Sequence, residues 1–495
     1  MPAIIVDPPS SRIDKLTRIK VTGLNGGQKF RLRLKSKDAH KVKWRSSDVL
    51  TAKSDGTLDV TMYHRTTNSD PMYLFNELAP HEEIPPNEAR FYAWAKDAHS
   101  WSGPEERRFK LSGHYIDDQD FRHPWATAEL KRSAGVSATT IKVKPGKAHW
   151  RDKSQRQGKS KRVPCPRLKH GLYGKYFEPA TTPPKDAAVL IFGGSEGRLS
   201  AAIQVAAGLL ATDGYPTLAL EYFAPPQDPT SPEAPDPPPP PWDGFPTELS
   251  QIPLEYFKGA LDWLSHRTKA PKKMFVSGTS RGSEVALLLG ANYRDILGSP
   301  PKDEYANLGV IANVPSLYVN GEAGPQPNSA RHSAWTLGGE EIPFDHHTSN
   351  RPDPAAAIPV QQIAGPIFLD GGADDQVWYS GVAVKEILAR VNTNGRNPHD
   401  VDSHLYQRGG HGLGILVAYL PRAFSKESPP PQPPPFAPPP TMGSRIGGFL
   451  HGAWTGASNV AKSLRAALSG ASPDENNIID GDLWPKLRAY LEKHS

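Results

Sequence analysis

Cysteine is almost absent from the 495-residue sequence, which contains only Cys165. A single cysteine cannot form a disulfide within the chain, so a disulfide-stapled secreted fold is excluded and a reducing compartment is favoured. No apolar run approaches the roughly 20 residues that a membrane-spanning helix needs. The first 15 residues also lack the basic and apolar regions of a secretory signal. We therefore expect a cytoplasmic protein without a membrane span.

Proline, by contrast, is abundant: the 52 prolines are about twice the usual frequency. Many of them lie in two segments, 224–242, which includes the unbroken run Pro237–Pro241, and 428–441. Polyproline favours an extended, solvated backbone that buries little surface. We interpret both segments as spacer insertions, with proline-rich ligands for protein docking as the alternative.

Positive charge is concentrated in one stretch. The whole chain carries a net charge of +6, yet residues 142–169 contain eleven basic residues and a single acid, Asp152. The stretch lies in a segment without clear periodicity, 121–170, which we predict to be a basic linker. Its only aromatic residue is Trp150, and its charges lack the spacing of an amphipathic helix. Neither nucleic acid nor an anionic membrane is therefore the expected partner.

Residues 1–120 have the pattern of a small all-β domain. Apolar and polar residues alternate with period two at 19–23, 29–34, 90–95 and 108–111, as they do in half-buried strands. Turn signals such as Asn25-Gly26-Gly27 separate these runs. Short strands at this spacing predict a β-sandwich.

Residues 171–495 alternate between strand and helix patterns. Strands are expected at 187–192, 217–220, 274–276, 308–312, 366–369 and 403–406, and helices at 199–213, 254–266 and 382–391. This alternation predicts a mostly parallel, doubly wound sheet with helices on both faces. A further helix is expected at 483–491, with Asp482 as its N-cap.

The stretch around Ser280 carries the clearest functional pattern. The residues Gly278-Thr279-Ser280-Arg281-Gly282 follow an apolar strand and precede an apolar helical pattern. This is the G-x-S-x-G nucleophile elbow in its strand–turn–helix context. A serine on so sharp a turn needs neighbours without a Cβ, which Gly278 and Gly282 provide. Ser280 is the candidate nucleophile, and an ordinary turn between a strand and a helix is the alternative.

The partners of such a serine follow it in a fixed order, first an acid and then a histidine, each after a later strand. The acid is expected in the turn that holds Asp374 and Asp375. We prefer Asp375 because it occupies the G-x-x-D position counted from Gly372. The histidine is expected to be His411, because it follows the last strand and its glycine neighbours would let the imidazole reach Ser280.

An oxyanion hole needs two backbone N–H donors, one after the nucleophile and one in the loop after an early strand. Arg281 supplies the first, and Ser195 in the run Gly193-Gly194-Ser195 is expected to supply the second. This run lacks the G-x-G-x-x-G dinucleotide pattern, so we expect no nucleotide cofactor. The pair His346-His347 has no second ligand motif nearby, so no metal site is expected.

Segments over most of the chain resemble the acyl-CoA thioesterase / bile acid-CoA:amino acid N-acyltransferase family. Those similar to its immunoglobulin-like N-terminal domain are 19–28, 44–47, 54–60 and 71–75. Those similar to its catalytic domain are 171–179, 192–197, 215–223 and 252–264, together with the elbow, the Asp374-Asp375 turn with Trp378, and Gly410-His411. The resemblance implies an immunoglobulin-like sandwich followed by an α/β-hydrolase domain.

The resemblance also implies a function. In this family a serine, acid and histidine triad, here Ser280, Asp375 and His411, cleaves fatty acyl-CoA thioesters. Members that transfer the acyl group to amino acids carry cysteine as the nucleophile, so Ser280 favours hydrolysis to free fatty acid and CoA. An N-acyltransferase or a dienelactone-hydrolase-like carboxylesterase is the alternative, and a non-catalytic binding protein is another. With acyl-CoA as substrate, the basic stretch 142–169 would attract the phosphates of CoA.

Overall fold

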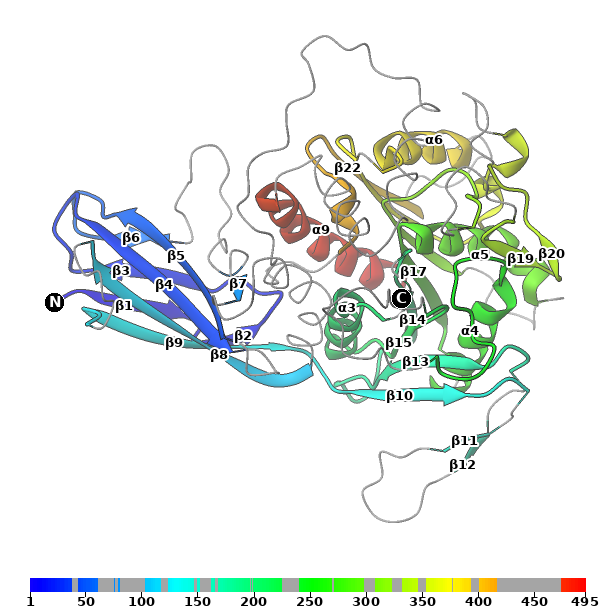
Figure 1. The fold of residues 1–495 in the computed structure, drawn as a ribbon, viewed down its shortest axis with the longest axis horizontal. Helices are drawn as coiled ribbons and strands as arrows, with labels where there is room; N and C mark the ends of the chain where they lie inside the picture. The colour runs from blue at the N-terminus through cyan, green and yellow to red at the C-terminus, as the bar shows by residue number, and fades with distance from the viewer. Residues whose placement is uncertain are drawn as a thin grey trace, which may run out of the picture. The chain divides into compact units, whose positions relative to one another are not determined.

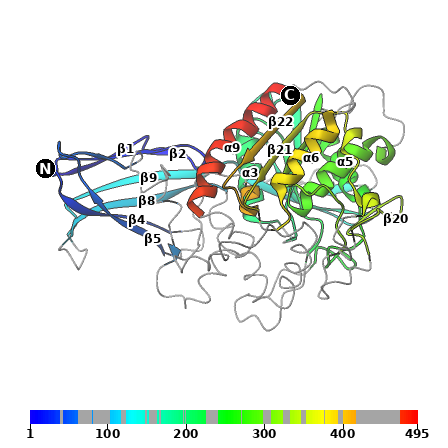
Figure 2. The ribbon, with the colours of Figure 1, turned by 90° about the horizontal axis from the view of Figure 1, so that it is seen from above.

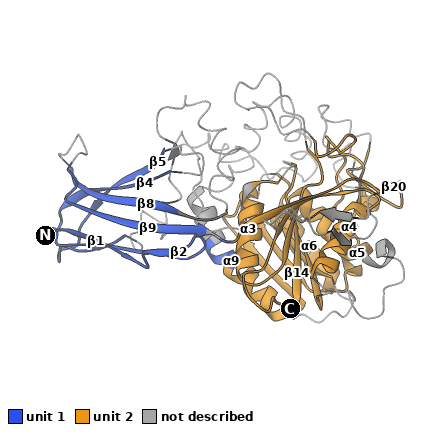
Figure 3. Ribbon diagram, turned by 90° about the horizontal axis from the view of Figure 1, so that it is seen from below, with its two compact units in different colours: residues 1–135, 416–428, 472–484 blue, residues 136–415, 429–471, 485–495 orange. Residues whose placement is uncertain are grey.

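The computed structural model describes about two thirds of the chain in detail (Figure 1). The described residues are 1–37, 43–60, 75, 79–80, 103–116, 123–146, 149–151, 162–164, 168–195, 197, 199–224, 240–268, 271–297, 308–322, 332–345, 353–375, 377–392, 400–415 and 473–495. They divide into two compact units, one built from residues 1–135 and 473–484 and the other from residues 136–415 and 485–495 (Figure 3).

The first unit contains two β-sheets. The smaller sheet has the order β1 (Ala3–Asp7), β3 (Arg18–Thr22) and β6 (Leu58–Asp59). The larger has the order β2 (Ser10–Arg12), β9 (Ala126–Ala134), β8 (Gly103–Tyr115), β4 (Lys29–Lys37), β5 (Lys43–Thr51) and β7 (Ala79–Pro80). The strands predicted at 19–23, 29–34 and 108–111 are confirmed, whereas the one at 90–95 lies outside the described residues.

The two sheets of this unit share an apolar core because alternate side chains of each strand point inward. Phe30, Leu32 and Leu34 of β4 are fully buried, together with Trp44 of β5 and Leu111 of β8. The described strands of the first unit therefore form two sheets around one core, and an all-β, immunoglobulin-like domain stays a prediction.

The segment 121–170 differs from the predicted linker. Its first part forms β9 of the small unit, and residues 138–143 form β10 (Ala138–Val143), which pairs with the large sheet of the second unit. Ile141 and Val143 of β10 are buried, whereas Lys142 between them is exposed. The exposed lysines give the stretch its basic character and so conceal a strand of period two.

The second unit is organised around an eight-stranded sheet (Figure 1). Its order is β10, β13 (Leu172–Phe177), β15 (Thr217–Leu220), β14 (Ala187–Phe192), β17 (Lys273–Thr279), β18 (Gly309–Asn313), β21 (Ile367–Gly372) and β22 (Val401–Tyr406). β10 and β13 pair antiparallel, and every pair from β15 to β22 is parallel. The predicted mostly parallel sheet is confirmed, and its parallel strands end at one common edge.

Helices cover both faces of this sheet (Figure 2). One face packs against α4 (Leu254–Thr268), α5 (Arg281–Leu297) and α6 (Ser380–Asn392). The other packs against α3 (Ala201–Thr212) and the second half of α9 (Pro473–His494). All residues of β14, β18 and β21 are buried, as expected for parallel strands between two helical layers.

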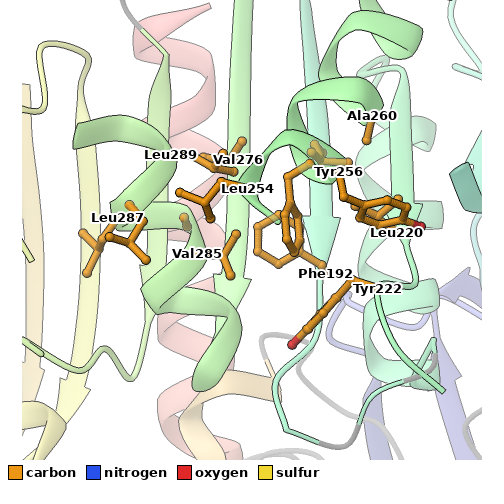
Figure 4. Close-up of a cluster of buried hydrophobic side chains, with 14 of the residues drawn as sticks. Phe192, Leu220, Tyr222, Leu254, Tyr256, Ala260, Val276, Val285, Leu287 and Leu289 are labelled. Carbon is orange, nitrogen blue, oxygen red and sulfur yellow. The ribbon is translucent and has the colours of Figure 1, made fainter. Parts of the chain in front are cut away.

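The core of the second unit is rich in aromatic side chains (Figure 4). The ring of Phe192, the last residue of β14, packs edge-on against Phe257 at 5.1 Å and Tyr222 at 6.2 Å. Tyr256 of α4 donates its hydroxyl to the carbonyl of Glu221 at 2.5 Å. These contacts lie at the end of β14, so they support the loop that begins at Gly193.

The proline-rich segments are only partly described. Residues 225–239 and the whole of 428–441 lie outside the described residues. The two ends of the first segment, Ala224 and Trp242, are buried in the core rather than solvated. The Ala224 N–H donates to the Pro246 carbonyl at 2.8 Å. Both ends of the predicted segment 224–242 are therefore anchored in the core, and the extent of the insertion stays a prediction.

The C-terminal helix α9 is longer than predicted. It starts at Pro473, so Asp482 lies inside the helix and is not its N-cap, and Pro485 is an interior residue. A proline is tolerated in the first turn of a helix, so Pro485 in the sequence favours a start near residue 483, nine or ten residues later than the start in the structure. Tyr490, which is 1% exposed, packs its ring against Phe275 of β17 at 5.9 Å and Phe368 of β21 at 5.3 Å. Its hydroxyl donates to the Val310 carbonyl at 3.4 Å.

No helix in the described part of the chain is both long and apolar enough to span a membrane.

The Tyr490 ring joins three strands, so removing it should destabilise the second unit. We expect Tyr490→Ala to lower the free energy of unfolding by about 3–5 kcal/mol, because it leaves a cavity between β17 and β21. Tyr490→Phe keeps the ring and removes only the long hydroxyl contact, so it should cost no more than about 0.5–1.5 kcal/mol. Urea unfolding followed by fluorescence measures both, and equal losses for the two variants would contradict the packing role of the ring.

Candidate active site

Ser280 occupies the sharp turn between β17 and α5. Its φ is +56°, in the left-handed region that a serine seldom adopts. Hydrogen bonds on both sides hold this conformation: the Ser280 N–H donates to the Asn313 carbonyl at 3.0 Å, and the Ser283 N–H donates to the Ser280 carbonyl at 2.9 Å. The strand–turn–helix context that the sequence predicted for this serine is therefore confirmed.

The flanking glycines are required by close backbone contacts. A Cβ on Gly278 would lie 2.0 Å from the carbonyl oxygen of Gly282, which no side chain could tolerate. A Cβ on Gly282 would lie 2.2 Å from the carbonyl oxygen of Gly193. The first contact is the clash expected from the sequence. The second shows in addition that the glycine loop after β14 lies directly against the elbow.

His411 lies within hydrogen-bonding distance of Ser280. It is the first residue of a short 3₁₀ helix, His411–Ile415, that follows β22. Its Nε2 is 2.9 Å from the Ser280 Oγ, and its side chain is 13% exposed. A neutral imidazole with a proton on Nδ1 can accept the hydroxyl proton of Ser280 at this distance.

Asp375 lies on the other side of the His411 ring. Its Oδ2 is 2.9 Å from the His411 Nδ1, and its Oδ1 accepts the Val377 N–H at 2.8 Å. Burial by itself raises the pKa of the Asp375 carboxyl, but the facing His411, the Ser380 hydroxyl and the Val377 N–H outweigh burial and hold the pKa below its usual value. The carboxylate is thus ionised at neutral pH and accepts a hydrogen bond from the Nδ1–H of His411.

The structure distinguishes between the two adjacent aspartates. Asp375 is fully buried and faces His411, whereas Asp374 is half-buried and its N–H donates to the Gly409 carbonyl at 3.1 Å. A Cβ on Gly372 would lie 1.8 Å from the carbonyl oxygen of Gly409. This contact joins the loop that carries the aspartates to the loop that carries His411, and it turns Asp375 toward the imidazole.

Trp378 contacts the imidazole, although the sequence assigned it no separate role. Its ring meets the His411 ring edge-on at 5.0 Å with an interplanar angle of 83°. Its indole N–H donates to the Val314 carbonyl at 2.9 Å. Val314 follows β18 and has φ +43°, a strained value for a β-branched residue. In the sequence, the signal for Trp378 is its position three residues after Asp375.

The two predicted oxyanion-hole residues lie on loops next to Ser280. Arg281 is the first residue of α5, where backbone N–H groups have no intrahelical acceptor. Ser195 is exposed in the turn after β14, beside the Gly193 carbonyl that contacts Gly282. The Tyr222 hydroxyl lies 3.1 Å from the Gly193 carbonyl oxygen and 2.6 Å from that of Gly194, and so holds this loop. The oxyanion role of the two N–H groups stays a prediction.

Within the described ranges, no group of three or more His, Cys, Asp or Glu side chains is placed to hold a metal ion. His346 and His347 lie outside those ranges.

Comparison with curated proteins finds relatives that act on acyl-CoA, as their names state. The chain is 23% identical over 257 residues to the mouse (Mus musculus) acyl-coenzyme A amino acid N-acyltransferase 1, covering 52% of this chain and 55% of that protein. It is 22% identical over 242 residues to the mouse bile acid-CoA:amino acid N-acyltransferase, covering 48% of this chain and 51% of that protein. The chain thus spans about half the length of the curated relatives it matches.

Among solved structures, similarity is found to hydrolases and esterases. A dienelactone hydrolase from Klebsiella pneumoniae is 13% identical with a TM-score of 0.31, and the match covers 55% of this chain and 87% of that one. The esterase Est22 is also 13% identical with a TM-score of 0.31, covering 55% of this chain and 71% of that one. The TT1662 protein from Thermus thermophilus is 16% identical with a TM-score of 0.28, covering 57% and 94%.

The comparison with protein families identifies the domain around Ser280. Residues 252–427, which include Ser280, Asp375 and His411, match the family described as "BAAT / Acyl-CoA thioester hydrolase C terminal". This agrees with the acyl-CoA relatives and with the family that the sequence motifs resemble. Residues 252–427, about a third of the chain, are thus similar to the C-terminal domain of this family.

Proposed function

We propose that the chain is a serine-dependent acyl-CoA thioesterase that releases free fatty acid and CoA. The observation that carries this proposal is the continuous set of hydrogen bonds from Ser280 Oγ through both ring nitrogens of His411 to Asp375, each 2.9 Å long. The match to this family supports a thioester or ester as the bond that is cleaved. The nature of the acyl group is not part of the proposal.

In the first half of the reaction, Ser280 Oγ attacks the thioester carbonyl while its proton passes to His411 Nε2. The buried carboxylate of Asp375 stabilises the imidazolium that results. The carbonyl oxygen becomes negatively charged, and the N–H groups of Arg281 and Ser195 are the proposed donors to it. The carbon–sulfur bond then breaks, the leaving sulfur takes the proton from His411, and an acyl-Ser280 ester remains.

In the second half, a water molecule replaces CoA beside the acyl-enzyme. His411 removes a proton from this water, and the resulting hydroxyl attacks the ester carbonyl. The carbon–oxygen bond to Ser280 breaks, and His411 returns the proton to Ser280 Oγ. The sum of both halves is consumption of one water and one acyl-CoA, with release of one fatty acid and one CoA.

Transfer of the acyl group to an amino acid is the second candidate function, because both mouse relatives are named as N-acyltransferases. Hydrolysis is favoured by the nucleophile. The family resemblance associates transfer with cysteine, and this chain has serine at position 280 and its only cysteine at position 165. A carboxylesterase with the same residues, and a binding protein that no longer catalyses, are the remaining alternatives.

We expect Ser280→Ala and His411→Ala each to lower kcat by about 10⁴ or more, because each removes a member of one proton-transfer unit. Asp375→Asn should also lower kcat by up to about 10⁴, since asparagine favours the wrong tautomer of the imidazole. Hydrolysis of acyl-CoA can be followed by thiol release, with circular dichroism to verify folding.

Asp374→Asn is the matched control for this series. It makes the same change of one carboxylate to an amide at the neighbouring position, which does not face His411, so kcat should stay within about threefold of the wild type. If Asp374→Asn were the more damaging of the two, the acid would be Asp374. If Ser280→Ala kept near-normal turnover, the proposed nucleophile would be wrong.

The products distinguish hydrolysis from transfer. With acyl-CoA in the presence of glycine or taurine, we expect free fatty acid and CoA with little N-acyl amino acid, because water can deacylate a serine ester once a general base is present. Mass spectrometry of the products measures the ratio. A predominance of N-acyl glycine or N-acyl taurine would overturn the proposal in favour of an acyltransferase.

A further inference from the structure

A buried ion pair lies in the first turn of α5, directly after the nucleophile. The Arg281 Nη1 donates to the Glu284 Oε1 at 2.8 Å, and the two side chains are 6% and 0% exposed. The sequence predicted a role only for the backbone N–H of Arg281. Arg281 and Glu284 are nevertheless three residues apart, which is the spacing of an ion pair along one helix. Removing two charges from water costs more than such a pair usually returns, so stability does not explain it.

The carboxylate of Glu284 accepts hydrogen bonds from three different residues. Besides Arg281, its Oε1 accepts the Asn320 Nδ2 at 2.7 Å, and its Oε2 accepts the Asn320 N–H at 3.3 Å and the Trp335 indole N–H at 3.0 Å. Asn320 lies in the segment after β18, and Trp335 begins β19 (Trp335–Leu337). One buried carboxylate therefore joins the nucleophile helix to two further parts of the second unit.

The guanidinium of Arg281 is held from the opposite side. Its Nη2 donates to the Gly321 carbonyl at 2.7 Å and to the Asn320 carbonyl at 3.2 Å. The guanidinium also lies over the Trp335 ring, 5.9 Å from the ring centre. Because both terminal nitrogens of the guanidinium are held, the Arg281 side chain restrains the backbone from which it extends. That backbone carries one of the two proposed N–H donors to the oxyanion.

We propose that Glu284 is a positioning residue that orients the Arg281 N–H toward the developing oxyanion through the buried Arg281–Glu284 pair. The inference rests on the proposed nucleophilic role of Ser280. The carboxylate does not contact the substrate. It fixes the first turn of α5 against residues 320–321, so that the donor is in place before the reaction begins. A donor held in advance requires no rearrangement in the transition state.

Glu284→Gln tests this role because it keeps the size of the side chain but replaces one acceptor oxygen with an amide NH₂. That NH₂ would face donors from Asn320, Trp335 or Arg281, so the first turn of α5 should shift. For hydrolysis of p-nitrophenyl butyrate we expect kcat to fall about 10- to 100-fold, while KM stays within about twofold. The affinity for phenylboronic acid, which forms a tetrahedral adduct on the serine, should fall by a similar factor.

Active-site titration with a fluorophosphonate separates positioning from a purely structural role. The rate per titrated site should fall for Glu284→Gln, whereas misfolding would lower the number of titrated sites and leave the rate per site unchanged. Asp213→Asn is the control. It breaks another ion pair of the second unit, to Arg488 at 2.6 Å, at the C-terminal end of α3, and should leave kcat and boronate affinity unchanged.

A second variant decides the outcome if Glu284→Gln does not fold. Trp335→Phe keeps an aromatic ring but removes the indole donor to Glu284 together with part of the buried ring, so kcat per site should fall about 3- to 10-fold with KM unchanged. Unchanged kcat per site in whichever variant folds, or a rise in KM alone, overturns the positioning role.

Measuring acyl-CoA hydrolysis and boronate binding separately distinguishes the thioesterase proposal from the positioning role of Glu284. A wild-type protein that binds the boronate and cleaves the ester but not acyl-CoA refutes the thioesterase alone, and leaves the positioning role to be decided by the variants. A wild-type protein that neither binds the boronate nor cleaves the ester refutes both the thioesterase proposal and the positioning role of Glu284.

Discussion

The left-handed turn at Ser280 is the constraint on which the rest of the second unit depends. A serine with φ +56° is stable only where the surrounding structure determines its conformation. Here the neighbouring strand β18 accepts its N–H, and the backbone of Gly282 approaches that of Gly193 so closely that no Cβ fits between them. The parallel order of β14, β17 and β18 places these three strand ends side by side, and this order makes the turn possible.

A second close approach forms the other half of the site. Gly372, the last residue of β21, contacts the backbone of Gly409 after β22. The loop after β21 carries Asp375 toward His411, and the loop after β22 carries His411 toward Ser280. Asp375 and His411 are thus brought together by backbone contact between neighbouring strands of one sheet, before their hydrogen bond is considered. The ring of Trp378 packs edge-on against the imidazole of His411. The geometry at Ser280 is therefore built from loops that follow four parallel strands.

Each buried charge near Ser280 has partners that compensate for its loss of water. Asp375 accepts N–H groups of His411 and Val377, and Glu284 accepts four N–H donors, including the guanidinium of Arg281. Such compensation is what makes a buried charge tolerable. Both carboxylates act on residues beside the nucleophile, one on the imidazole and the other on the first turn of α5. The match to the family, the hydrolysis proposal and the proposed positioning role of Glu284 thus concern the same domain.

The sequence by itself determined the order of the elements, the elbow around Ser280, and the turn with Asp374 and Asp375 and the histidine His411 as candidates, because strand and helix periodicity and glycine spacing are local properties. Only the tertiary structure decided between Asp374 and Asp375, since one residue of turn geometry sets which carboxylate faces the imidazole. It also decided that β10 is a strand of the large sheet, which its exposed lysines conceal, and that α9 begins at Pro473. Glu284 and Asn320 are 36 residues apart, and a contact of that separation exists only once β17 and β18 lie side by side.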